Sequence, residues 1–238
     1  MALTPEQEWT LVACGMIAHA DDVLEIGEWD EIVRLINARI TDEEQQHWLG
    51  VLTDRAQLET LFAGMAPPPP IFSETLMRQA WHMALADGHG SDIEAAVHDR
   101  IADRIGISAE QAADWRQLWN ERAAARAELV VAFAAAVANL DGRMDSAEAA
   151  QFDTLLERQP VSVSRRLQLA ELLYSPPQLE VIATRIGEFD EEEREAVLYD
   201  IAPIVNASHR GEQEREAFYM LADAAAIPRD KADALLSA

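Results

Sequence analysis

Three short segments of the chain space their acidic side chains so that the carboxylates could converge on a divalent cation. Each segment has an Asp at the end of an apolar run and a Glu seven residues later, and the pairs are Asp21 and Glu28, Asp87 and Glu94, and Asp141 and Glu148. A further acid lies between each pair, namely Glu25, Asp92 and Asp145. Carboxylate oxygens are the ligands that Ca²⁺ and Mg²⁺ prefer. The loops are therefore candidate sites for Ca²⁺ or Mg²⁺, with Zn²⁺ a weaker candidate, and the sequence requires no cofactor.

The same acids also fit a structural role as helix caps. Ser91 and Glu94 have the spacing of a capping box, in which each side chain bonds the backbone N–H of the other residue, and Asp145 and Glu148 have it too. The loops are too short for the twelve-residue ligand order of an EF-hand. A fourth segment has Ser208 where the others have Asp, six residues before Glu214, and we expect no cation there.

Other residues with chemical potential form no recognisable catalytic set. His82, His89 and His98 lie close together in sequence among several acids, which are residue types that bind Zn²⁺ or Ni²⁺, but surface histidines are the simpler interpretation. Cys14 lies inside an apolar run and is expected to be a core thiol. The chain has no glycine-rich phosphate loop and no nucleophile motif. We therefore predict no catalytic residues and no enzymatic activity.

The elements that must position these loops have helical periodicity, and no segment alternates as a strand does. The pattern predicts an all-α protein with helices near residues 4–20, 28–39, 55–65, 73–86 and 92–105, and with another helix that begins at Thr41. Residues 109–140 contain neither Gly nor Pro, so they form one long helix or two helices with a break near Asn120. Pro67–Pro70 is expected to be a stiff polyproline spacer, and a ligand for a proline-recognition domain is the alternative.

The chain also repeats itself at a nearly constant interval of about 120 residues. Asp21 and Glu28 match Asp141 and Glu148 at an offset of 120, and Gln57-Leu58-Glu59 recurs as Gln178-Leu179-Glu180 at an offset of 121. Glu94 matches Glu214 in the same way. This spacing predicts an internal duplication. We expect two tandem, pseudo-symmetric helical domains, at 1–120 and 121–238, each with two acidic helix–loop–helix units, of which the last is degenerate.

The charge balance restricts the classes of partner. The chain has 43 acidic and 19 basic residues, for a net charge of −24. Such a charge repels nucleic acid and anionic membrane surfaces and attracts divalent cations or a basic protein. No apolar run reaches the roughly 20 residues that span a bilayer, and the first residues lack a basic signal-peptide region. One cysteine fits a reducing compartment. We expect a cytoplasmic protein that binds protein partners.

The acidic motifs resemble those of the TerB-like family of the bacterial tellurite-resistance system. Ala-Leu-Ala-Asp-Gly at 84–88, followed by Glu94, carries the resemblance most fully, and the segment from Ala138 to Glu148 carries a variant. The resemblance implies all-helical, pseudo-symmetric, non-enzymatic domains that bind divalent cations at these motifs and act in stress-response complexes. This chain departs from the pattern at Asp22, where glycine is expected, and at Ser208, where Asp is expected.

Two functional hypotheses follow from these observations. The first is an acidic helical scaffold or interaction module in a bacterial stress-response or defence complex, with cation binding at its loops. The alternative is an acidic inhibitor or immunity-type protein that covers a basic surface of its partner. A scaffold distributes its carboxylates among the loops, whereas an inhibitor gathers them on one face beside an exposed aromatic anchor.

Overall fold

Helices form all of the regular structure that can be described in this protein. The computed structural model describes residues 3–21, 28–29, 32–33, 36, 42–86, 90–140, 146–207 and 211–237. Over these residues no strand occurs, so the prediction of an all-α protein is confirmed. No helix among them combines the length and the apolar character needed to cross a membrane.

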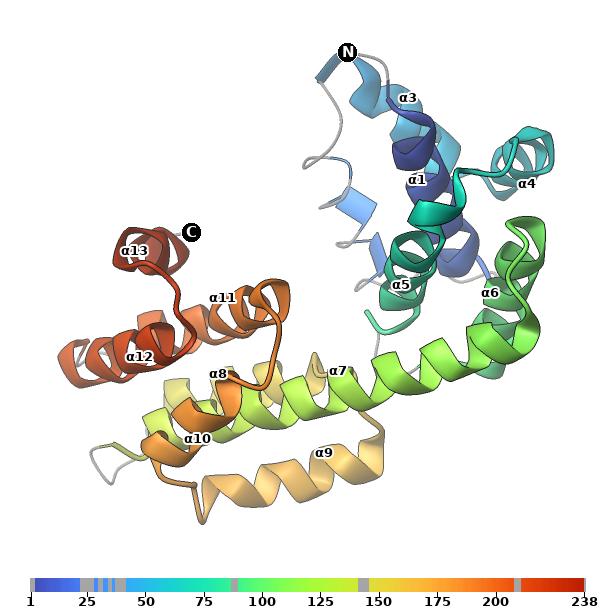
Figure 1. The fold of residues 1–238 in the computed structure, drawn as a ribbon. Helices are drawn as coiled ribbons and strands as arrows, with labels where there is room; N and C mark the ends of the chain where they lie inside the picture. Colours follow the sequence, from blue (N-terminus) through green and yellow to red (C-terminus); the bar gives the residue numbers. More distant parts are fainter. Residues whose placement is uncertain are drawn as a thin grey trace. The chain divides into compact units, whose positions relative to one another are not determined.

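The chain divides into two compact units, Met1–Glu121 and Arg122–Ala238. The helices that begin in the first unit are α1 (Pro5–Ala18), α3 (Asp42–Leu52), α4 (Arg55–Gly64), the short 3-10 helix η1 (Pro70–Phe72), α5 (Ser73–Ala84), α6 (Asp92–Arg104) and α7 (Ala109–Ala138). Those of the second unit are α8 (Ser146–Glu157), α9 (Val163–Ala170), η2 (Glu171–Leu173), α10 (Leu179–Ile186), α11 (Glu191–Ala207), α12 (Glu212–Ala224) and α13 (Arg229–Ser237). Figure 1 shows their order along the chain.

The central helix of the first unit is α1, which begins where the sequence predicts. Thr4 caps it in a reciprocal pair: the Thr4 N–H donates to Gln7 Oε1 at 2.9 Å, and the Gln7 N–H donates to Thr4 Oγ1 at 3.3 Å. Pro5 occupies the first turn, where its missing N–H leaves no bond unmade. Every residue from Trp9 to Ala18 is buried.

Helix α1 contacts α3, α4, α5 and α6 of the first unit. Gly15 permits a close approach of α1 to α3 and α4. A Cβ atom at Gly15 would lie 2.9 Å from Leu52 Cδ2 and 3.1 Å from both Leu58 Cδ atoms. The helix predicted at 28–39 is helical at the positions that are described, with Ile32 and Ile36 buried. Trp29 has the helical spacing of the apolar face that includes Ile32 and Ile36, but 38% of it is exposed.

The segment after Ser108 is one continuous helix, α7. Of the two possibilities that the sequence allowed, one long helix is therefore correct, and no break occurs near Asn120. Its second half is the central helix of the second unit, where Ala127 and all of the residues from Leu129 to Ala138 are buried. Alanine and valine dominate this stretch, and small side chains let neighbouring helices approach closely. In the second unit α11 packs against α8, α12 and α13, and α10 packs against α12.

Candidate functional site

The structure describes only part of each predicted acidic loop. Glu25, Asp87, Asp141 and Asp145 lie outside the described residues, and Glu148 is described only as a backbone position in α8. Asp21 is exposed in the turn that follows α1, whereas Glu28 is 4% exposed. Among the residues that are described, no three His, Cys, Asp or Glu side chains gather as a metal site would require. Cation binding at the loops therefore stays a prediction.

The second loop shows what its Glu does at the start of α6. The Ser91 N–H donates to Glu94 Oε2 at 2.7 Å, and the Glu94 N–H donates to Ser91 Oγ at 3.2 Å. This is the capping box that the sequence predicts, and its Glu94 residue is 6% exposed. Asp92, the other predicted ligand, is exposed in the first turn of α6. One carboxylate oxygen of Glu94 thus bonds the backbone of its own helix.

His19 and Asn139, which precede the first and third loops, make matching side-chain contacts with backbone carbonyl groups. Two residues before Asp21, His19 Nε2 lies 2.8 Å from the Leu52 carbonyl oxygen. Two residues before Asp141, Asn139 Nδ2 donates to the Leu173 carbonyl oxygen at 3.0 Å. The two side chains are 120 residues apart, and the two carbonyls are 121 residues apart.

In the part of the chain that is described, the histidines near the second loop do not form one cluster with the acidic residues. His82 is exposed on α5, and His89 lies outside the described residues. His98 is fully buried, so the expectation of a surface histidine is wrong for this residue. Residues 94, 98, 101 and 102 all lie on the buried face of α6. This helical spacing was the sequence signal that could have predicted the burial of His98.

Both ring nitrogens of His98 bind protein groups. Arg116 Nη1 lies 3.0 Å from Nδ1, and because arginine only donates, Nδ1 accepts and the neutral ring carries its proton on Nε2. That N–H donates to the Met77 carbonyl oxygen at 3.0 Å. Burial, followed by the nearby Arg116 charge, lowers the pKa of His98 to about 4 against the opposing effects of Met77 and Asp99. Arg116 also pairs with Asp99 at 2.6 Å. This arrangement is a buried structural network, not a metal site.

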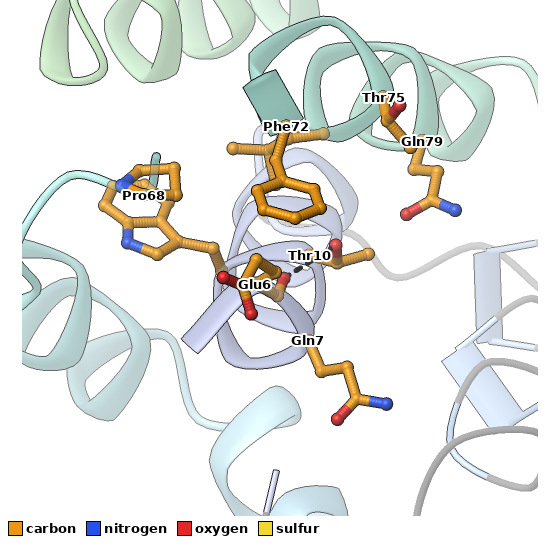
Figure 2. A pocket seen from close by; sticks show the side chains of 9 residues that line it. Glu6, Gln7, Thr10, Pro68, Phe72, Thr75 and Gln79 are labelled. Carbon is orange, nitrogen blue, oxygen red and sulfur yellow. Dashed lines mark hydrogen bonds between the residues drawn. The ribbon is translucent and has the colours of Figure 1, made fainter. Parts of the chain in front are cut away.

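The first unit has a cleft between α1 and α5, which the sequence did not predict. Its volume is about 240 Å³, and its lining is Glu6, Gln7, Trp9, Thr10, Pro68, Phe72, Thr75, Leu76 and Gln79. Figure 2 shows the Phe72 ring above Glu6 and Thr10 of α1, with Pro68 on one side and Gln79 on the other. The residues come from two segments, 6–10 and 68–79, that are 58 positions apart in sequence, so only packing brings them together.

The polyproline segment forms one wall of this cleft. Trp9 Nε1 donates to the Ala66 carbonyl oxygen at 2.7 Å, and Arg104 Nη2 donates to the Met65 carbonyl oxygen at 2.7 Å. These bonds hold the chain as it enters the prolines. Pro68 is buried, whereas Pro67, Pro69 and Pro70 are exposed. The segment therefore connects α4 to α5 and also shapes the cleft.

Two large apolar side chains are exposed at the cleft. Phe72 lines it and is 41% exposed, and the adjacent Ile71 is 83% exposed. The one charged residue of the lining is Glu6. Within the described residues, no hydrogen bond or ion pair occupies the Glu6 carboxylate, although its backbone carbonyl accepts from Thr10 Oγ1 at 3.0 Å. The cleft thus combines an available carboxylate with exposed aromatic surface.

Comparison of the chain with protein-family models, with curated proteins and with solved structures finds no match.

Proposed function

We propose that this protein is a non-enzymatic, acidic interaction module whose first unit binds a basic segment of a protein partner. One observation carries the proposal: the cleft between α1 and α5 sets the Glu6 carboxylate beside the exposed Phe72 ring, with no basic residue in its lining. Aromatic side chains and arginine are enriched in the central part of protein interfaces, so an exposed ring beside a carboxylate suits a basic partner.

The charge of the first unit supports the same proposal. Residues 1–121 contain 22 acidic and 7 basic residues, so this unit is more acidic than the rest of the chain. An excess of this size attracts basic partners over a range set by the Debye length, about 8 Å at physiological salt. The field accelerates association, and the cleft would supply the local contacts.

Matching local geometry in the two units supports the inference of an internal duplication. The contacts of His19 and Asn139 are one such match, and the buried Glu94 and Glu214 are another. By their resemblance to TerB-like domains, the two units would form a tandem module in a bacterial stress-response or defence complex. The second candidate is an inhibitor that covers a basic surface, and the exposed Phe72 beside Glu6 favours it.

The proposal is tested by calorimetric titration of the full chain with a capped basic peptide and with an acidic peptide of equal length. We expect saturable binding of the basic peptide only, with an affinity that falls as NaCl is raised from about 50 to 200 mM. Equal affinity for both peptides, or no binding of the basic one at low salt, would contradict the proposal.

A further inference from the structure

We propose that the cleft between α1 and α5 receives an arginine side chain from the basic segment of the partner. This inference rests on the proposed function and specifies the chemistry of its binding site. The cleft holds about 240 Å³, which is smaller than the roughly 300–1,000 Å³ of pockets for drug-sized ligands. It is suited to one long side chain.

The walls of the cleft match the two parts of an arginine side chain. Phe72, which is 41% exposed, offers an aromatic ring for the aliphatic stem and for the flat face of the guanidinium, whereas Trp9 and Leu76 also line the cleft but are buried. Glu6 offers a carboxylate that accepts two parallel N–H bonds from the guanidinium fork. Lysine presents a more strongly hydrated point charge and neither stacks nor bonds in this bidentate manner.

The first unit already holds one of its own arginines in this way. On α4, Glu59 Oε1 accepts from Arg100 Nη1 at 3.0 Å, and the guanidinium carbon of Arg100 lies 5.0 Å from the centre of the Phe62 ring. A carboxylate and an aromatic ring thus bind the guanidinium together. The cleft presents the same pair of groups, Glu6 and Phe72, without an arginine of this unit between them.

Because Glu6 lies in the first turn of α1, the helix dipole opposes the binding of a cation beside it. The N-terminus of a helix carries the equivalent of about half a positive charge, which disfavours a cation nearby. Glu6 and Glu8 lie in this turn and carry two full negative charges. The negative charge exceeds the dipole contribution, and the capping box of Thr4 and Gln7 already satisfies part of the free N–H groups.

The surroundings of the cleft favour a peptide segment over a free amino acid. Ile71 is 83% exposed, and Pro67, Pro69 and Pro70 are exposed in the segment that forms one wall. A free arginine would leave this apolar surface in water. A segment with apolar residues on both sides of its arginine would cover it, and the area buried would add to the affinity.

The test uses the full chain in 0.15 M NaCl and four probes in calorimetric titrations. The probes are the peptide Ac-Ala-Leu-Arg-Leu-Ala-NH₂, the same peptide with lysine or with citrulline at its centre, and N-acetylarginine amide. Citrulline keeps the shape of arginine and removes its charge. We expect the arginine peptide to bind roughly tenfold more tightly than the citrulline peptide, and more tightly than the other two probes.

Matched substitutions locate the binding. We expect Glu6→Gln to weaken binding of the arginine peptide roughly tenfold and Phe72→Ala roughly fivefold, whereas Phe72→Tyr keeps the ring and restores binding. Glu8→Gln makes the same charge change on the same helix, and Ile93→Ala truncates an exposed apolar residue on α6. Both controls should stay within about twofold of the unsubstituted chain. Tryptophan fluorescence confirms that each variant is folded.

The outcomes separate this inference from the proposed function. If the arginine peptide binds but Glu6→Gln and Phe72→Ala bind it as well as the controls do, the cleft is not the site and only this inference fails. Equal binding of N-acetylarginine amide and the peptide would overturn the choice of a peptide segment. If no basic peptide binds even at low salt, the proposed function fails together with the inference.

Discussion

The junction of α6 and α7 in the first unit and the junction of α12 and α13 in the second have the same backbone but different interiors. Both turns reverse through a left-handed residue, Gly106 with φ of 80° and Ala226 with φ of 57°. In both, an N–H donates back to a helix carbonyl at 2.9 Å, from Ile107 to Ala102 and from Ile227 to Ala222. Each member of one junction is 120 residues from its counterpart.

The side chains packed inside these junctions belong to different chemical classes. In the first unit they are His98, Asp99 and Arg116, which form a polar network. At the positions 120 residues later they are the buried Phe218 and Leu236, and the partly buried Tyr219, whose hydroxyl donates to Asp233 Oδ1 at 2.5 Å. Phe218 is as fully buried as His98. The comparison shows that the same backbone geometry at the helix ends is compatible with a buried His98 in a polar network and with a buried Phe218 and Leu236 at the corresponding positions.

The largest expected effect concerns the response of the first unit to acid. Burial lowers the pKa of His98 to about 4 from 6.5, so between these values the unfolded chain binds a proton that the folded chain does not. The free energy of unfolding therefore falls as the pH falls, by about 3 kcal/mol in total from His98. We expect His98→Phe to remove this part of the pH dependence.

Urea unfolding between pH 7 and pH 4, followed by tryptophan fluorescence, measures this effect. All six Trp residues lie within 1–121, so the signal reports on the first unit. The free energy of unfolding is plotted against pH for His98→Phe and for the unsubstituted chain, and the two slopes are compared. The comparison is needed because acidic residues also titrate in this range. Parallel pH profiles for His98→Phe and the unsubstituted chain would contradict the assignment.

The next prediction concerns the polar network of His98, Asp99 and Arg116, and tests whether the residues found at the corresponding positions of the second unit can replace it. Arg116→Leu removes the donor to His98 Nδ1 and the partner of Asp99, and it also removes the guanidinium that lies 5.6 Å from the centre of the Trp81 ring. We expect a loss of about 2 kcal/mol in the stability of the first unit. Adding His98→Phe should recover at least half of this loss in a double-mutant cycle. Simple additivity of the two losses would show that the network is not a unit.

A smaller pair of effects sharpens the comparison at the turns, and the two should have opposite signs. Gly106→Ala places a side chain at φ of 80°, where a Cβ atom meets nothing within 4 Å, so backbone strain alone should lower the stability of the first unit by about 1 kcal/mol. Ala226→Gly relieves the same strain in the second unit and should raise its stability by up to about 1 kcal/mol. Tryptophan fluorescence and calorimetry of the full chain separate the two changes.

The smallest expected effect concerns cations at the second loop. Glu94 caps α6 through the Ser91 N–H, so we expect millimolar Ca²⁺ or Mg²⁺ to raise the stability of the first unit by less than about 0.5 kcal/mol. Thermal unfolding of metal-stripped protein, with and without the ion, measures it. A larger, saturable stabilisation that Asp87→Ala removes would instead establish the predicted cation site. The same titration with Asp21→Ala and Asp141→Ala examines the other two loops.

Local signals in the sequence were enough to predict the helices. Thr4 with Gln7, and Ser91 with Glu94, form the caps that their spacing predicts, because a capping bond joins residues only three positions apart. Helical periodicity, which also depends only on residues close in sequence, predicted the other helices between residues 28 and 140. The helix in which Trp29 lies shows the limit of this approach, since periodicity identifies an apolar face but not how completely other elements cover it.

Only the tertiary structure decided which polar groups are buried and which surfaces meet. His98 is buried because Met77, Arg116 and two Trp rings surround it, and these come from α5 and α7. The cleft likewise exists because α1, the prolines and α5 pack together, over separations that no local pattern records. By itself, the sequence determined the helices, the acidic charge and the repeat, since these depend on neighbouring residues, on composition and on spacing. The interior network and the cleft depend on contacts between distant segments, and so only the packed chain shows them.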